Sequence, residues 1–96
     1  MLQTIITAVQ NKEVLSFTYE GYTRVVEPHA VGVSTAGHKV LRCFQVGGHH
    51  EKQNHNWDLV LLSKIVGLSA TGQRFSSERL GYKGGDKGMI TIYAQL

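Results

Sequence analysis

The chain has 96 residues, 42% of them hydrophobic and 18% charged, a composition typical of a small folded domain and not of a disordered one. Ten Lys and Arg against seven Asp and Glu give a net charge of +3, which permits an anionic ligand or nucleic acid without requiring either. A lone cysteine excludes an internal disulfide and indicates a reducing compartment. No segment approaches the ~20 apolar residues of a membrane span, so we expect a cytoplasmic protein with no membrane contact.

The amino terminus carries a helical pattern. Leu2, Ile5, Ile6 and Val9 are spaced i, i+3, i+4 and i+7, which places them on one apolar stripe of a helix. The following "VLSFTYE" changes to a period of two. We therefore expect the helix to span about residues 2–12.

Two strands should follow the helix and form a hairpin. In "VLSFTYE" apolar and polar side chains alternate, which predicts a strand over about residues 14–19. "YEGY" is a short turn in which Gly21 can adopt a positive φ, and "YTRVVEPHAVGV" then predicts an antiparallel strand over about residues 22–33. Pro28 has no N–H to donate, so we expect it at a sheet edge or a bulge.

The rest of the chain predicts three more strands, over about residues 38–46, 56–66 and 89–95. The middle one is apolar on both faces, which favours a strand covered by a barrel or a helix. "SATGQRFSSERLGYKGGDKG" is rich in Gly and Ser, and we expect it to be irregular. One helix and five short strands predict a mainly β fold in a single domain over residues 1–96, a small five-stranded Sm/SH3-like barrel with an N-terminal helix.

Three of the five histidines lie between two expected strands, in "GGHHEKQNH". His49, His50 and His55 would have to converge in space to bind a metal, and neighbouring side chains such as His49 and His50 tend to point apart. Neither a pair of cysteines nor an HExxH motif supports them. We interpret this stretch as a solvated loop and predict no metal site.

Two further patterns invite a catalytic or a phosphate-binding interpretation. A nucleophilic Cys43 would need a base and an orienting group, whereas its place on a strand between Arg42 and Phe44 indicates a small buried core residue. The glycines of "GYKGGDKG" come without a GxxxxGK[ST] motif or a following helical pattern, so a flexible connector explains them better. We predict no enzymatic activity, no catalytic residue and no cofactor.

Arg42 stands on a strand that is otherwise apolar. A guanidinium in this position must reach water, a carboxylate or a ligand, because a buried unpaired charge is costly. One interpretation is an internal ion pair with Glu27 or Asp58. The other is an anion contact on an open face of the barrel, for which arginine suits planar, bidentate recognition. The sequence leaves both open.

These pieces, in this order, resemble a WYL domain, the small Sm-like barrel found mostly in bacterial transcription regulators and CRISPR-associated proteins. "AVQNKEVLSFTYEG" is similar to the opening helix and first strand of the family, and "RVVEPHAV" to its arginine-to-EP segment. "GHKVLRCFQV" stands where the name-giving tripeptide occurs, and "NWDLVLLSKIVGLSATGQRF" is similar to the final core strand and the following TG…F. The resemblance covers nearly the whole chain.

Two departures from the family pattern bear on its function. The tripeptide reads Lys39-Val40-Leu41, so only its leucine is kept, and Asp58 stands where the family often has an arginine. Family members usually carry an N-terminal winged helix-turn-helix, for which the short lead before the first strand leaves no room. We therefore expect a stand-alone WYL-like protein without the helix-turn-helix, or a fragment of a regulator.

The resemblance implies a ligand-sensing regulatory module, in transcription or defence regulation, that binds nucleic acid or a nucleotide-like anion. Two arginines would pair with phosphate, and a histidine and a glutamine would supply hydrogen bonds. An aromatic side chain would stack on a base, although core packing is the favoured alternative for the aromatics. The expected ligand-binding residues are Arg24, His29, Arg42, Gln45, Tyr19 and Trp57.

The expected partners follow from the same fold. A small barrel leaves open strand edges and a modest core, so we expect a homodimer, formed by edge pairing or by the helix face. The alternative function is a protein–protein adaptor that modulates a larger partner without a small ligand. A large exposed apolar patch would favour the adaptor, and a basic pocket with aromatic walls would favour ligand sensing.

Overall fold

The computed structural model describes residues 1–48 and 56–96. The protein is mainly β with an N-terminal helix, as the sequence predicts, but the described residues contain six strands and not the expected five. In chain order the elements are α1 (Leu2–Asn11), β1 (Glu13–Tyr19), β2 (Tyr22–Ser34), β3 (Lys39–Gly48), β4 (Trp57–Leu61), the 3₁₀ helix η1 (Leu62–Lys64), β5 (Val66–Arg74) and β6 (Met89–Gln95).

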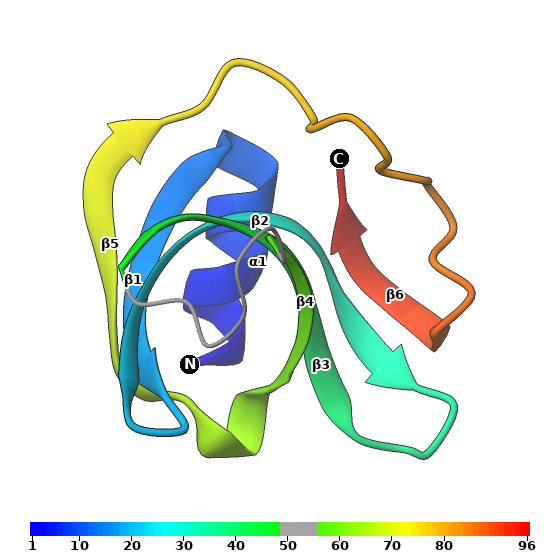
Figure 1. The fold of residues 1–96 in the computed structure, drawn as a ribbon. Helices are drawn as coiled ribbons and strands as arrows, with labels where there is room; N and C mark the ends of the chain where they lie inside the picture. The colour runs from blue at the N-terminus through cyan, green and yellow to red at the C-terminus, as the bar shows by residue number, and fades with distance from the viewer. Residues whose placement is uncertain (49–55) are drawn as a thin grey trace.

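The strands form one open antiparallel sheet in the order β4-β3-β2-β1-β5. The sixth strand, β6, lies off this path and pairs with the carboxyl half of β2, from Ala30 to Ser34. The sheet is strongly curved, and Figure 1 shows its strands arching around the helix α1 at the centre of the view. The helix contacts β1, β2, β5 and β6, so it covers the inner face of the sheet.

Local sequence explains the first half of the fold. The apolar stripe of α1 buries Ile5, Ala8 and Val9 against the sheet. The β1–β2 hairpin turns at Glu20 and Gly21, with φ of 53° and 82°. Positive φ at both central residues is the type I′ geometry, whose twist matches the flanking strands. The expected turn at Gly21 is confirmed.

The expected strand over residues 56–66 is wrong in this form, because the chain turns a corner inside it. Leu62 and Ile65 are buried on the inner face, whereas Ser63 and Lys64 between them are exposed. The 3₁₀ turn lets both apolar side chains reach the core. Residues 66–74 then pair with β1 as β5, so the first part of the segment expected to be irregular is a strand.

The long strand β2 bends at a bulge. Pro28 pairs with Cys43 and Ala30 with Arg42, which leaves His29 as the extra residue. Pro28, which has no N–H to donate, lies directly before this extra residue, so the bulge expected at Pro28 is confirmed. The carbonyl oxygen of His29 instead accepts a hydrogen bond from the N–H of Leu96, at 2.9 Å.

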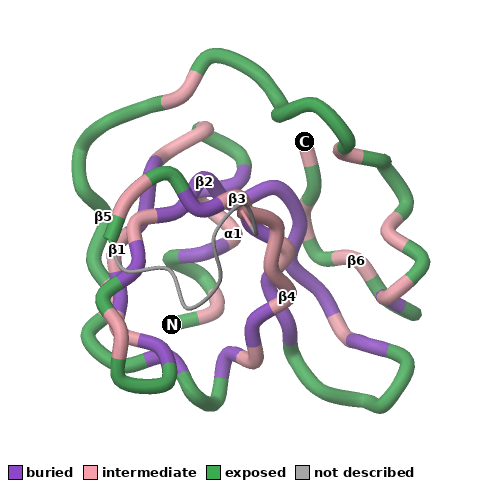
Figure 2. The backbone as a smooth tube through the Cα atoms, viewed as in Figure 1, coloured by how far each residue is buried: buried purple, intermediate pink, exposed green. Residues whose placement is uncertain are grey.

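The sheet buries side chains on both faces. The main core lies on the inner face, between the sheet and α1, and includes Phe17, Leu41 and Cys43. A second, smaller core lies on the outer face and is built on Ala30, Val40 and Met89. Figure 2 shows that among the strands burial is concentrated in β1 to β3, that β4 is mostly intermediate, and that β5 and the segment after it are mostly exposed. Within residues 1–48 and 56–96, no helix is long and apolar enough to cross a membrane.

Candidate functional site

Residues 75–88, here called the connector, join β5 to β6. They contain neither helix nor strand, which confirms the irregular structure expected for this part of the chain. The connector runs from the end of β5, over the top of the view, to the start of β6 (Figure 1). Its residues 81–87 lie against the sheet at Arg42 and Trp57, with which they line a pocket.

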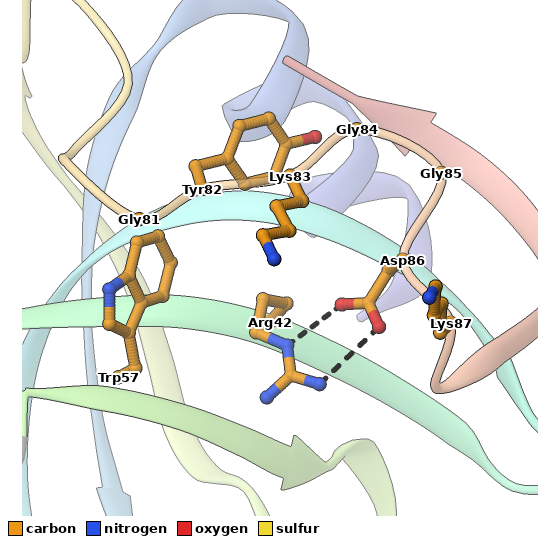
Figure 3. Close-up of a pocket in the computed structure, with 9 residues that line it drawn as sticks. All are labelled: Arg42, Trp57, Gly81, Tyr82, Lys83, Gly84, Gly85, Asp86 and Lys87. Carbon is orange, nitrogen blue, oxygen red and sulfur yellow. Dashed lines mark hydrogen bonds and ion pairs between the residues drawn. The ribbon is translucent and has the colours of Figure 1, made fainter.

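A pocket of about 370 Å³ lies between the connector and the outer face of the sheet. This volume is within the range of ~300–1,000 Å³ that is usual for small-molecule sites. Strands β3 and β4 contribute one residue each, and the "GYKGGDK" stretch of the connector contributes the rest (Figure 3). The lining residues are Arg42, Trp57, Gly81, Tyr82, Lys83, Gly84, Gly85, Asp86 and Lys87.

Arg42 forms an ion pair with Asp86 at the floor of this pocket. Its Nε donates to Oδ2 at 2.8 Å, and Nη2 donates to Oδ1 at 3.4 Å. The internal pair expected for Arg42 exists, but neither Glu27 nor Asp58 is its partner. The hydrogen bond from the Arg42 guanidinium is the main cause that lowers the pKa of Asp86. Burial opposes it, and a hydrogen bond from the N–H of Gly88 adds a smaller lowering effect. Asp86 is therefore a carboxylate at neutral pH.

The pocket has an excess of positive charge. Arg42, Lys83 and Lys87 face one carboxylate, that of Asp86, so three cations minus one anion leave +2. In Figure 3 the Lys83 side chain points down toward Arg42, between Trp57 and Asp86, and Lys87 lies beside Asp86. Such a concentration of charge in a hollow attracts anions.

Trp57 forms the aromatic wall of the pocket and belongs to a larger ring cluster. Its indole lies edge-on to Phe44, with centroids 5.2 Å apart, and nearly parallel to Tyr82, at 6.4 Å. The indole N–H donates to the carbonyl of Leu80 at 3.3 Å, which ties the wall to the connector. Burial raises the pKa of Tyr82, and the charges of Glu78 and Asp86 add to this effect.

His29 lies behind the wall and holds the connector in place. It is fully buried, stacked on Phe75 at 5.6 Å and edge-on to Trp57 at 4.8 Å. Its Nδ1 lies 2.9 Å from the carbonyl of Glu27, and its Nε2 accepts a hydrogen bond from the N–H of Arg79 at 3.0 Å. This pattern requires the neutral ring with the proton on Nδ1. Both nitrogens are thus engaged inside the protein.

A second ion pair anchors the connector near His29. Arg79 donates from Nε and Nη2 to the two carboxylate oxygens of Glu27, at 2.7 and 3.0 Å. The guanidinium also lies over the ring of Phe44, 4.8 Å from its centroid. The hydrogen bond to Glu27 raises the pKa of Arg79. Two arginine–carboxylate pairs therefore fix the connector to the sheet, at Arg79 and at Asp86.

The other three expected binding residues lie on the opposite face of the sheet. Arg24 pairs with Asp58, Nη1 to Oδ2 at 3.1 Å. Asp58 is opposite Cys43 on β3, whereas Leu59 is opposite Arg42, so alternation places Asp58 on the inner face and Arg42 on the outer. The structure does not bring the two arginines together.

Tyr19 and Gln45 accompany Arg24 on the inner face. The guanidinium of Arg24 lies over the ring of Tyr19, 5.3 Å from its centroid, and the Tyr19 hydroxyl accepts a hydrogen bond from the N–H of Leu61. Both Tyr19 and Gln45 are buried, and the Gln45 amide donates to the carbonyl of Gly47 at 2.9 Å. These contacts give Tyr19 the packing role that was the alternative to base stacking.

The structure also bears on the cysteine and the metal site that the sequence analysis considered. Cys43 is fully buried, and burial raises the pKa of its thiol far above the neutral range, which suits a core residue and not a nucleophile. No cluster of three metal-ligating side chains occurs within residues 1–48 and 56–96. His49, His50 and His55 lie outside the described residues.

Sequence reasoning identified only Arg42 and Trp57 among the residues that line the pocket. It missed Tyr82, Lys83 and Asp86, which belong to the "GYKGGDKG" stretch interpreted as a plain connector. The signal available was composition: two lysines and an aromatic side chain interleaved with glycines.

No protein-family model, no curated protein and no solved structure matches the chain. The resemblance to WYL domains therefore remains a prediction, and the site itself carries the functional argument.

Proposed function

We propose that this protein is a non-enzymatic ligand-sensing module that binds nucleic acid or a nucleotide-like anion in the pocket under the connector, in transcription or defence regulation. The observation that carries the proposal is the convergence of three cations with an aromatic wall in one hollow (Figure 3). Cations recognise phosphate, and the face of an aromatic ring stacks on a base. Arg42 and Trp57 are the two contact residues that the sequence and the pocket have in common.

The fold supports the proposed kinship with WYL domains. The N-terminal helix, the curved antiparallel sheet with the order β4-β3-β2-β1-β5 and the 3₁₀ turn that connects its two edge strands support a partly closed barrel of the kind that the resemblance implies. In this proposal β6 and the connector are additions to the five-stranded unit. They place the pocket outside the barrel, on the face opposite Arg24.

The test is binding of a labelled single-stranded oligonucleotide and of adenosine monophosphate to the wild type and to Arg42→Ala, at two salt concentrations. Affinity should fall as salt rises, because phosphate contacts release counterions. Arg42→Ala should weaken binding by about 1–3 kcal/mol, the worth of charge-assisted hydrogen bonds. Its melting temperature should change little, because Arg42 itself is 29% exposed and the Asp86 carboxylate keeps its hydrogen bond from Gly88.

The matched control is Arg24→Ala, which removes the same charge from the opposite face. It should lower the melting temperature, because it removes a buried guanidinium that packs over Tyr19 and pairs with Asp58, and it should keep the affinity within about twofold. Absence of binding by the wild type to both probes would refute ligand sensing at this pocket. Equal loss of affinity in the two variants would assign the effect to net charge alone.

The adaptor function remains the alternative, and the exposed apolar side chains of β5 and β6 favour it. Val66 on β5 is 65% exposed, and on β6 Ile90 is 66% and Tyr93 41% exposed. Because β5 and β6 lie on opposite sides of the molecule in Figure 1, a partner protein or a second copy of the chain would cover one strand or the other. Pull-down of one stoichiometric protein that persists in Arg42→Ala, with no nucleotide binding, would support the adaptor.

A further inference from the structure

We propose that Asp86 is an internal substitute for the phosphate of a ligand, and that a nucleoside monophosphate binds by displacing it from Arg42. The inference rests on the proposed function, because it concerns the same pocket, and it adds the ligand class and the competing group. The ligand is a phosphate monoester that carries a planar ring. Its phosphate takes the position of the Asp86 carboxylate, and its ring lies against Trp57.

The geometry of the ion pair carries the first step. Arg42 uses Nε and Nη2, one edge of its guanidinium, to bind the two oxygens of Asp86. Two oxygens of a phosphate group can accept the same pair of hydrogen bonds from this edge of the guanidinium. The carboxylate thus already marks where an anion binds.

The position of Asp86 makes exchange feasible. Its side chain is 10% exposed and that of Arg42 is 29% exposed, so the guanidinium remains accessible from the pocket. Asp86 belongs to the connector, and Oδ1 also accepts a hydrogen bond from Gly88, two residues further on, at 2.8 Å. Oδ1 keeps this local bond after the carboxylate leaves Arg42, so only Oδ2 loses its hydrogen-bond partner and has to be solvated from the pocket.

Charge and size select the ligand. Lys83 and Lys87 add two positive charges beyond those of the Arg42–Asp86 pair. A phosphate monoester carries about two negative charges near neutral pH, so it neutralises them better than the single charge of a carboxylate does. The volume of about 370 Å³ lies near the lower end of small-molecule sites and suits one nucleotide. Trp57 supplies the ring surface that free phosphate would not use.

The experiment compares wild type, Asp86→Asn and Glu20→Gln by calorimetric titration with adenosine monophosphate, adenosine, inorganic phosphate and a short single-stranded oligonucleotide. Asp86→Asn removes the competing charge and keeps an oxygen for Gly88. Glu20→Gln removes the same charge from the exposed β1–β2 turn, where Glu20 is 53% exposed, and controls for net charge. Asp86→Asn should bind adenosine monophosphate about tenfold more tightly than wild type, and Glu20→Gln within about twofold.

A second measurement reports the exchange in the wild type. The carboxyl ¹³C resonance of Asp86 titrates at a lowered pKa while Arg42 holds it, so saturation with adenosine monophosphate should move that pKa back toward its ordinary value. An unchanged Asp86 titration in the saturated protein would overturn the exchange.

The outcomes separate the two proposals. If Asp86→Asn binds adenosine monophosphate no better than the wild type, the exchange is wrong while the proposed function stands. If adenosine binds as well as adenosine monophosphate, phosphate exchange is likewise wrong. If only the oligonucleotide binds, and equally to wild type and Asp86→Asn, the nucleotide-sized ligand is overturned. If no probe binds to any variant, both proposals fail.

Discussion

The Nε2 atom of His29 accepts a hydrogen bond from the backbone N–H of Arg79 at 3.0 Å, across 50 positions of the sequence. A histidine nitrogen can accept only when it is unprotonated. This hydrogen bond between the connector and β2, which adds to the Arg79–Glu27 pair, therefore exists only with a neutral imidazole. Protonation would place two donors against each other in a fully buried position.

We predict from this relationship that stability falls as the pH drops below about 6.5. Burial lowers the pKa of His29 from 6.5, against smaller opposing effects of the Glu27 carbonyl and of the charges of Glu27 and Glu78. The pKa of His29 is lower in the folded than in the unfolded protein. The contribution of the neutral His29 to the free energy of unfolding is therefore complete above pH 6.5, and it is lost as the pH falls from there through the folded pKa. Urea unfolding between pH 7.5 and 5 measures the slope.

Two variants make the pH prediction specific. His29→Phe keeps an aromatic ring in the cluster and cannot titrate, so it should be less stable at pH 7.5, by about 1–3 kcal/mol for the two unpaired backbone groups, and should have a flatter slope. His38→Ser changes an exposed histidine and should retain the wild-type slope. A slope that persists in His29→Phe would assign the pH dependence to other groups.

Arg79→Ala should loosen the connector without unfolding the sheet. It removes two hydrogen bonds to Glu27 and leaves that largely buried carboxylate unpaired, whereas the arginine itself is 45% exposed. We expect the free energy of unfolding to fall by about 1 kcal/mol and amide exchange to become faster over residues 75–88. The amide-exchange rates of β1 to β3 should not change. Arg79→Lys should recover only part of the protection, because one ammonium cannot make the paired bonds.

The sequence predicted the local elements well and the connector poorly. The helix over 2–12 and the strands over 14–19, 22–33, 38–46 and 89–95 agree with the structure within about two residues at each end. Each of these segments either alternates or keeps a helical stripe, and this periodicity is a property of neighbours in the chain.

The remaining features depend on distant contacts. β5 buries almost no side chain, and it is a strand because its backbone bonds to β1, which a pattern of side chains cannot reveal. The partner of Arg42 could not be found from the sequence, because Asp86 lies 44 positions away on a segment with no periodicity. The two expected partners of Arg42 are used by other arginines, Glu27 by Arg79 and Asp58 by Arg24.

Gly32→Ala should detach β6 from the sheet. An added Cβ would collide with the backbone oxygen of Thr91 on β6, so the backbone of β6 would have to shift away from β2. We expect a loss of about 1–3 kcal/mol, typical of overpacking, together with exposure of Met89. Gly47→Ala on β3 is the matched control, because its Cβ would meet Val25 at an ordinary 3.4 Å. Equal stability of the two variants, measured by thermal melting, would contradict the prediction.

A homodimer is the last prediction, and β5 is the strand that should form it. Within the described residues β5 pairs only with β1, so its other edge offers unpaired backbone groups to a second copy. Val66 on this strand is 65% exposed and would be covered by the partner. We expect twice the mass of the chain by light scattering at tens of micromolar, where most specific dimers persist.

Val66→Lys should shift the protein to the monomer, because charged side chains on an edge strand oppose strand pairing. Val46→Lys, at a 41% exposed position on β3, makes the same change away from this edge and should leave the dimer intact. A monomeric wild type would refute the assembly, and a dimer that survives Val66→Lys would place the interface elsewhere, with the helix face as the next surface to test.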